Sequence, residues 1–254
     1  MKNHIILCAF GTTTRAKETY RRFEERLAPR FPDCRIHWTF SSPTVRRAAN
    51  QKSAAAHTDI AATLAKPEKV AVQSLHILPG YEFHRTVVET RKLSLPAAIG
   101  RPLLDRPQDF VRAAGALKDV VTNSGHDAAL VLGPGTDHPC RYLFLQLEKE
   151  LQRQLGEQIL FTTLEKPLIP AEQIIEKIAA AGHRSVYCIP FLMVAGMHLY
   201  RDIIGVSDDS WHSRFRHHRI DLDVRDQGIA LLDEIVSIFA DHIEAAFATL
   251  NRGI

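Results

Sequence analysis

Residues 128–136, AALVLGPGT, place a short apolar strand directly before a glycine turn, and residues 5–12, IILCAFGT, do the same near the start of the chain. A short apolar run that ends at glycine is typical of a strand buried in a parallel sheet. These two stretches therefore predict one buried strand in each half of the chain.

Two further pairs of segments extend this similarity between the halves. Residues 39–43, TFSSP, correspond to residues 163–167, TLEKP, and residues 79–85, PGYEFHR, correspond to residues 195–201, AGMHLYR. Each segment follows an apolar stretch. Matching positions along two halves of a chain indicate an internal repeat. The sequence thus predicts two lobes that are related by duplication.

Apolar strands alternate with helical patterns through both halves. Such alternation predicts an α/β fold with parallel sheets that are flanked by helices and joined by right-handed crossovers. The predicted strands are 5–10, 35–40, 69–78, 128–132, 158–163 and 185–192, and the predicted helices are 19–28, 58–64, 83–93, 141–155, 171–181 and 228–250. We expect two Rossmann-like lobes, residues 1–125 and 126–254, with a cleft between them and the boundary in the polar stretch 122–127.

The composition excludes several classes of function. Hydrophobic residues make up 45% and charged residues 24%, with a net charge of +3, which is ordinary for a globular protein. Scattered Lys and Arg give no footprint for nucleic acid. The four cysteines lack C-x-x-C spacing, which predicts free thiols in a reducing compartment. We find neither a signal segment nor a membrane span, and therefore expect a cytoplasmic protein; a homo-oligomer is left open.

Polar side chains at the predicted strand ends are the candidate site residues, because ligands of open parallel sheets bind outside the carboxyl ends of the strands. Glu165 and His198 follow strands of the second half, and a carboxylate with an imidazole suits cobalt, nickel, zinc or ferrous iron. For either residue alone, a surface Glu or a packed His is the simpler interpretation. The candidates from both halves are Thr12, Thr13, Ser41, Glu82, Glu165 and His198.

Other histidines are weaker candidates. His138 follows the second glycine turn and is a reserve ligand, whereas His76 lies in an apolar stretch and is interpreted as a hydrogen-bonded core residue. The basic stretch 211–219 contains His212, His217 and His218 and is interpreted as a solvated face.

The glycine turns at residues 11–14 and 133–136 match neither a P-loop nor a dinucleotide fingerprint, so no nucleotide is expected. Their amide and hydroxyl groups are suited to holding carboxylates.

Several blocks of the chain resemble the anaerobic cobaltochelatases that act on sirohydrochlorin, which are class II tetrapyrrole chelatases. These blocks are 10–12, FGT; 70–77, VAVQSLHI, followed by 79–82, PGYE; 190–198, PFLMVAGMH; and 208–211, DDSW. They follow the family's order over almost the whole chain. The resemblance implies ATP-independent insertion of a divalent metal, cobalt first and otherwise nickel or iron, into sirohydrochlorin or a related tetrapyrrole.

The resemblance also implies roles for individual residues. The family binds its metal with a His in a Gly-His-Gly turn, a Glu after the next strand, and a His after Val-Ala-Gly. The last two correspond to Glu165 and His198. Glu82 corresponds to a family Glu that would accept pyrrole protons together with His198, although a Glu stabilised by the helix dipole is the alternative. His84 as a haem ligand at a subunit contact is left open. The implied substrate-binding residues are Gly11, Thr12, Thr13, Ser41, Gly80, Tyr81, Gly135 and Thr136.

Pro134 stands where the family has the histidine of the Gly-His-Gly turn. Proline offers no ligand, and three protein ligands are usual in an open catalytic metal site. Three alternatives follow: weak presentation of the metal to the macrocycle, a different metal or tetrapyrrole, or a non-catalytic carrier of tetrapyrrole or metal. A two-lobed receptor of the periplasmic-binding type is disfavoured by the absence of a signal segment.

Overall fold

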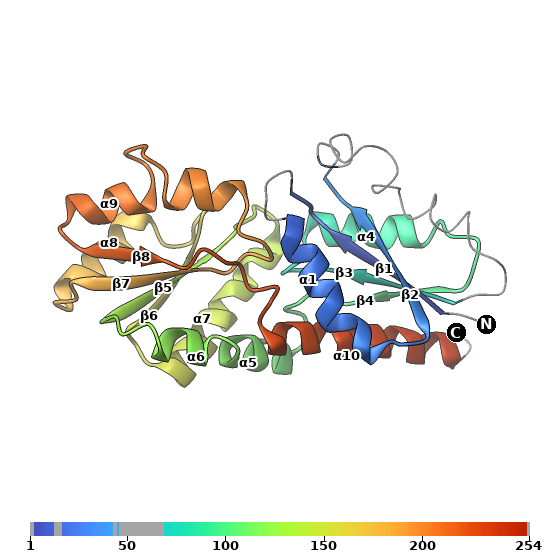
Figure 1. The fold of residues 1–254 in the computed structure, drawn as a ribbon. Helices are drawn as coiled ribbons and strands as arrows, with labels where there is room; N and C mark the ends of the chain where they lie inside the picture. Colours follow the sequence, from blue (N-terminus) through green and yellow to red (C-terminus); the bar gives the residue numbers. More distant parts are fainter. Residues whose placement is uncertain (1–2, 13–16, 43–44, 46–68, 253–254) are drawn as a thin grey trace. The chain divides into compact units, whose positions relative to one another are not determined.

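The computed structural model describes residues 3–12, 17–42, 45 and 69–252, whose arrangement is drawn in Figure 1. The chain divides into two compact units, residues 1–109 with 231–254, and residues 110–230. We call them the first and the second unit.

A parallel four-stranded sheet forms the centre of the described part of each unit. The strand order is β2-β1-β3-β4 in the first unit and β6-β5-β7-β8 in the second, so the two sheets have the same topology. This confirms the predicted α/β fold with Rossmann-like parallel sheets. The strands are β1 Asn3–Ala9, β2 Cys34–Phe40, β3 Val70–Ser74, β4 Ala97–Gly100, β5 Ala128–Gly133, β6 Ile159–Thr163, β7 Ser185–Pro190 and β8 Asp221–Val224.

Helices flank both sheets, as the sequence predicts (Figure 1). The helices are α1 Lys17–Leu27, α4 Tyr81–Thr90, α5 Pro107–Gly115, α6 Lys118–Thr122, α7 Leu143–Leu155, α8 Ala171–Ala180, α9 Trp211–His217 and α10 Asp233–Asn251. The short turns are the 3-10 turns η1 Ala28–Arg30 and η2 Pro139–Tyr142 and the π-helical turn η3 Leu199–Ile203.

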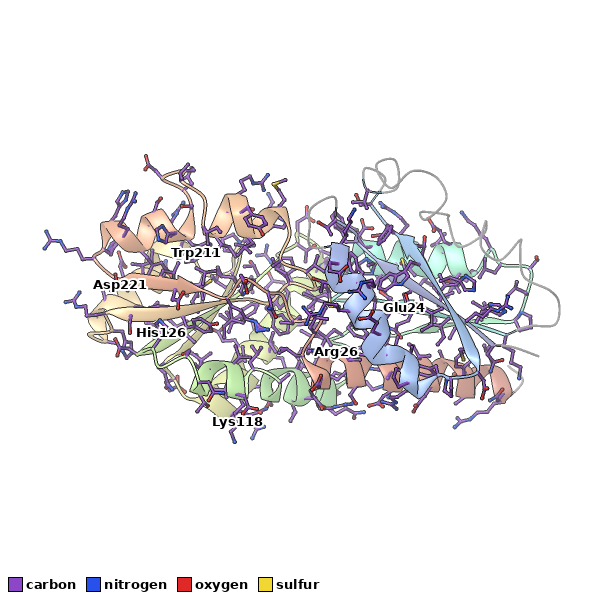
Figure 2. The ribbon with its side chains drawn as sticks, in the orientation of Figure 1. Glu24, Arg26, Lys118, His126, Trp211 and Asp221 are labelled. Carbon is purple, nitrogen blue, oxygen red and sulfur yellow. The ribbon has the colours of Figure 1, made fainter. Side chains whose placement is uncertain are left out.

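The core of the first unit lies between its sheet and the helices α1 and α10. The rings of Phe23 in α1 and Phe239 in α10 are fully buried and meet edge to face, with centroids 6.0 Å apart. Helix α4 covers the opposite face of the sheet from α10 (Figure 1). Arg26 at the end of α1, labelled in Figure 2, donates to the Leu231 carbonyl and lies 2.7 Å from the Asp233 carboxylate. These contacts fix the start of the terminal helix to the first unit.

Apolar side chains on both faces of β5 form the core of the second unit. Leu130 and Leu132 pack with Ile175 of α8 and Phe215 of α9 on one face. On α7, Phe144 contacts Phe161 of β6, with ring centroids 5.0 Å apart. A strand that is buried on both faces shows a continuous apolar run, which is why β5 is recognisable in the sequence.

The unit boundary differs from the predicted division at residues 125 and 126. It falls between Asp109 and Phe110 inside α5, and the chain returns to the first unit after Ala230. The reason is the amphipathic terminal helix, because its buried face packs on β3, β4 and α1 rather than on the second sheet.

Several predicted elements need correction. The predicted strand 69–78 ends at Ser74, because the His76 and Ile77 carbonyls accept bonds from the amides of Leu103 and Leu104 in a loop rather than from a strand. The predicted strand 185–192 ends at Pro190. The short strands β4 and β8 and the helices α5, α6 and α9 were not predicted. The predicted helix 58–64 lies outside the described residues.

Two properties expected from composition can be compared with the described residues. The four cysteines are free thiols, Cys8 and Cys188 buried and Cys34 and Cys140 half-buried. No helix in the described ranges is long and apolar enough to cross a membrane.

Candidate functional site

The backbone of Glu165 is held by the glycine turn that follows β5. Leu164 N donates to Gly133 O at 2.9 Å, and Glu165 N donates to Pro134 O at 3.2 Å. The Thr163 hydroxyl donates to Glu165 O at 3.0 Å. Gly135 has a φ of +84°, the left-handed conformation that favours glycine. The sequence of these two loops thus places the Glu165 backbone at the carboxyl edge of the second sheet, with an exposed side chain.

His198 occupies the start of the π-helical turn η3, after strand β7. Its Nδ1 lies 2.6 Å from Asp202 Oδ2. Arg201 in turn donates to both carboxylate oxygens of Asp202, at 2.6 and 3.0 Å. Burial opposes ionisation of Asp202, but the bonds from Arg201 and His198 outweigh it and hold the pKa of Asp202 below its usual range. The Asp202 carboxylate is therefore an ionised acceptor for the His198 ring.

Arg201 interacts electrostatically with Asp202, which contacts His198, and more weakly with Glu165. The Asp202 carboxylate, with a smaller effect from Glu165, raises the pKa of Arg201 above its usual value. Arg201 and Asp202 also line a cavity of about 500 Å³ in the second unit, beside Leu164 and Trp211. Within the described ranges, no group of three or more His, Cys, Asp and Glu side chains is arranged to hold a metal.

The reserve ligand His138 differs from His198 in the hydrogen bond that its Nδ1 makes. Its Nδ1 accepts a bond from Cys140 N at 3.1 Å and caps the turn η2. A neutral imidazole whose Nδ1 is an acceptor has its proton on Nε2, so neither nitrogen is free to bind a metal. Burial raises the pKa of the Cys140 thiol to about 11, which keeps it protonated at neutral pH. Neither side chain replaces the ligand missing at position 134 in this conformation.

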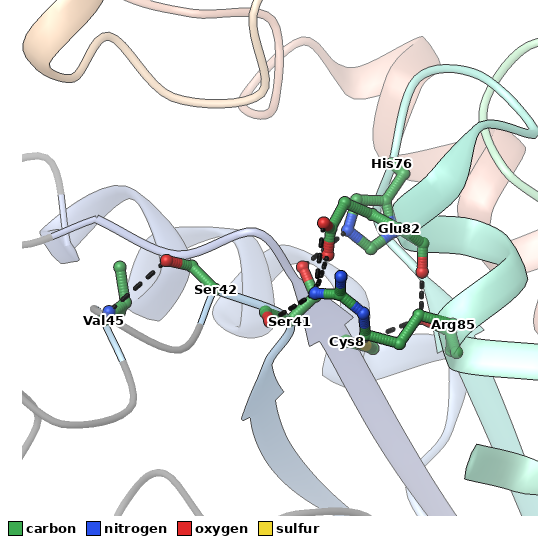
Figure 3. Close-up of polar contacts among 8 residues, drawn as sticks. Cys8, Ser41, Ser42, Val45, His76, Glu82 and Arg85 are labelled. Atoms are coloured by element: carbon green, nitrogen blue, oxygen red, sulfur yellow. Dashed lines mark hydrogen bonds and ion pairs between the residues drawn. The ribbon is translucent and has the colours of Figure 1, made fainter. Parts of the chain in front are cut away.

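The strand ends of the first unit carry a separate polar group, drawn in Figure 3. The His76 ring lies between two hydroxyls, with Nδ1 at 2.8 Å from Ser74 Oγ and Nε2 at 3.2 Å from Ser41 Oγ. Arg85 on α4 lies 3.3 Å from Glu82, whose side chain is 27% exposed. Thus His76 belongs to the loop group around Ser41, rather than to the core alone as the sequence suggested.

The described members of the remaining predicted substrate-binding set follow strands of their own units. Gly11 has a φ of +96°, and a Cβ there would lie 2.6 Å from Val45. Gly80 is the N-cap of α4, and the following Tyr81 is 57% exposed. Thr136 accepts a bond from His138 N at 3.1 Å. Thr12 is half-buried after β1, and Thr13 lies outside the described residues.

Four other described histidines are solvent-facing. His212, His217 and His218 are exposed on or directly after α9, whose buried side consists of Trp211, Ser213 and Phe215. This matches the interpretation of a solvated basic face. His84 is exposed on α4.

Sequence reasoning missed Asp202, Arg201 and the role of His76. The His-x-x-x-Asp spacing of 198 and 202 was a readable indication, because side chains four residues apart meet on a helical turn. The Ser74–His76–Ser41 contacts join two strand ends and have no local sequence pattern.

Comparisons with known proteins identify relatives that match nearly the whole chain. The family model described as cobalt chelatase (CbiK) matches residues 3–248. The sirohydrochlorin cobaltochelatase CbiKC of Nitratidesulfovibrio vulgaris is 30% identical, over 98% of this chain and 92% of its own. A sirohydrochlorin cobaltochelatase of Salmonella typhimurium is 25% identical, over 97% of both chains. The structure of SirB from Bacillus subtilis with Fe3+ shares the fold, with a TM-score of 0.66, 15% identity, and coverage of 100% of this chain and 98% of its own. The chain therefore belongs to the cobalt chelatase (CbiK) family.

Proposed function

We propose that this protein inserts Co2+ into sirohydrochlorin without ATP, and that His198 and Glu165 hold the metal. Relatives named for this reaction span almost the whole chain, which supports it. The observation that carries the proposal is local. His198 is held on its Nδ1 side by Asp202, and Glu165 is held by the turn after β5, both at strand ends of the second sheet.

The reaction needs a proton acceptor as well as a metal site. Insertion of a divalent metal replaces the hydrogens of two pyrrole N–H groups, so two protons leave the ring and no oxidant or nucleotide is required. We assign this role to Glu82, a carboxylate in the first turn of α4, with His198, whose Nε2 can take up a proton once the metal has passed to the macrocycle. Positioned side chains commonly accept protons in this way.

The substrate carries several carboxylates, and the strand-end loops offer groups to receive them. Backbone amides at glycine turns and helix starts bind anions, and hydroxyls add further donors. We assign this contact to Gly11, Thr12, Thr13, Ser41, Gly80, Tyr81, Gly135 and Thr136.

An anaerobic insertion assay with Co2+ and sirohydrochlorin tests the proposal through the spectral change of the macrocycle. We expect acceleration over a protein-free control, loss of acceleration in His198→Ala, and full activity in His212→Ala, which removes an exposed histidine of the same unit. Parallel reactions with Ni2+ and Fe2+ identify the preferred metal. A chain that leaves the spontaneous rate unchanged with every metal would refute the assignment.

The second candidate is a non-catalytic carrier of tetrapyrrole or metal. Pro134 favours it, because only two of the three family ligands are present. The same assay separates the two candidates, since a carrier would bind sirohydrochlorin and shift its spectrum without accelerating insertion.

A further inference from the structure

We propose that Asp202 is a positioning residue that holds the neutral His198 ring with its proton on Nδ1 and thereby directs the Nε2 lone pair to the metal. This inference rests on the proposed function, in which His198 binds the metal. Its structural part, the choice of ring nitrogen, can be measured without metal or substrate.

The contact between the two side chains decides which nitrogen carries the proton. Nδ1 lies 2.6 Å from Asp202 Oδ2, and an ionised carboxylate can only accept. The ring must therefore donate from Nδ1, which leaves Nε2 unprotonated when the imidazole is neutral. Histidines that bind metals commonly donate their other N–H to a carboxylate, and this fixes both ring orientation and basicity.

Arg201 fixes the Asp202 carboxylate, which in turn orients the His198 ring. Its Nε and one terminal nitrogen lie 2.6 and 3.0 Å from the two oxygens of Asp202. A two-point contact between a planar guanidinium and a carboxylate fixes the plane of the carboxylate as well as its position. Because the Asp202 side chain is only 27% exposed, the carboxylate oriented in this way has little room to turn away from His198.

The π-helical turn explains why residues 198 and 202 meet at a strand end. Ile204 N donates to Leu199 O at 2.9 Å, the wider bond of a π-helix. Leu199 and Ile203 are buried in the second core and anchor the turn. Isolated π-turns occur frequently at functional sites. The turn thus presents His198 and Asp202 together from a rigid base.

His138 serves as an internal comparison. Its Nδ1 accepts a backbone N–H, so its neutral ring carries the proton on Nε2. Two histidines of the same unit are therefore expected in opposite tautomers, and only His198 has a lone pair directed away from its protein partner.

The first test is long-range 1H–15N correlation of the histidine rings in the metal-free protein at about pH 9, where imidazoles are neutral. The His198 signals are assigned by their absence in His198→Ala. We expect the Nδ1–H tautomer in the wild type and in Asp202→Asn, whose side-chain oxygen still accepts. We expect a shift toward Nε2–H in Asp202→Ala. A wild-type His198 with its proton on Nε2 would overturn the inference.

The second test is Co2+ affinity, measured by titration of the folded, substrate-free variants. We expect Asp202→Ala to weaken binding by about 10–100-fold, the usual effect of removing such a partner. Asp202→Asn should recover part of the loss, and the exposed Asp208→Ala should bind like the wild type. If His198→Ala weakens binding and Asp202→Ala does not, the role of Asp202 is wrong. If His198→Ala binds Co2+ as tightly as the wild type, the proposed metal site itself is wrong.

Discussion

Gly135 and Glu165 are in contact through their backbones, so closely that a Cβ on Gly135 would lie 1.8 Å from the Glu165 carbonyl oxygen. The bonds from residues 164 and 165 to the carbonyls of residues 133 and 134 continue this contact. The turn after β5 therefore acts as the support for the loop after β6. A proposed metal ligand depends on a glycine thirty positions earlier in the chain.

Gly135→Ala is expected to displace Glu165 and weaken Co2+ binding. A contact of 1.8 Å with backbone cannot be relieved by rotation of a side chain, and a φ of +84° costs a non-glycine residue about 1–3 kcal/mol in addition. Gly182→Ala is the matched control, because Gly182 has a φ of +79° with no atom within 4 Å of the added Cβ. Urea unfolding and Co2+ titration should show a loss of stability in both variants and a loss of affinity only in Gly135→Ala. Equal Co2+ affinities would contradict the supporting role of this turn.

Pro134→His is expected to add the third metal ligand. The Pro134 carbonyl accepts the bond from Glu165 N at 3.2 Å, so position 134 lies next to a residue that already holds the metal in our proposal. We expect Co2+ affinity and insertion rate to rise on the order of tenfold, which corresponds to about 1.4 kcal/mol. Pro134→Ala controls for the loss of proline alone. If the histidine and alanine variants behave alike, position 134 does not face the metal.

Glu82→Gln is expected to slow insertion while leaving Co2+ binding intact. The amide cannot accept a pyrrole proton, and the loss of a general base typically lowers a rate by about 100-fold or more. Glu82 belongs to the first unit, whereas Glu165 and His198 belong to the second. Glu89→Gln makes the same change near the other end of α4 and should leave both Co2+ binding and the insertion rate unchanged. A normal insertion rate in Glu82→Gln would show that another residue accepts the protons. His76, which contacts Ser41, would then be the first candidate.

The repeat was sufficient to predict the architecture because it marks the interior strands. β1 and β5 are buried on both faces, so their apolar runs stand out, and each leads into a glycine turn. β4 and β8 have four residues each and pair on one side only, with β3 and β7. A four-residue pattern carries too little periodicity to be recognised. The strands β4 and β8 therefore became visible only in the structure, whereas the longer outer strands β2 and β6 were predicted.

The terminal helix and the site show the limits of sequence reasoning in a different way. The apolar face of α10 was recognisable, but a pattern does not say which sheet it covers, and the contact of Phe239 with Phe23 decided that. At the proposed site, His198 and Glu165 are candidates because each follows a strand. The importance of Asp202 depends on the π-helical turn and on Arg201, and neither has a distinct pattern in the sequence.

Asp109 and His242 form a buried pair that connects α5 to the terminal helix. His242 Nε2 lies 3.4 Å from Asp109 Oδ2, and both side chains are 2% exposed. Arg106 N donates to the same Asp109 oxygen at 2.8 Å. Burial opposes ionisation of Asp109, but His242 and the Arg106 amide outweigh it and lower the pKa of Asp109. A lowered folded-state pKa stabilises the protein above the unfolded value of about 3.9, and this contribution is lost as the pH falls through the folded value.

Asp109→Asn is therefore expected to destabilise the first unit at pH 7 by about 1–3 kcal/mol, the usual cost of weakening the bonds to a buried polar group. The difference from the wild type should shrink below about pH 4, where the wild-type carboxylate becomes protonated as well. Trp38 lies in the first unit and Trp211 in the second, so Trp38 fluorescence in a Trp211→Phe background follows the first unit during urea unfolding. Asp33→Asn changes an exposed carboxylate of the same unit and should have little effect at either pH. A difference between Asp109→Asn and the wild type that stays constant from pH 7 to pH 3 would show that Asp109 stabilises the fold through packing rather than charge.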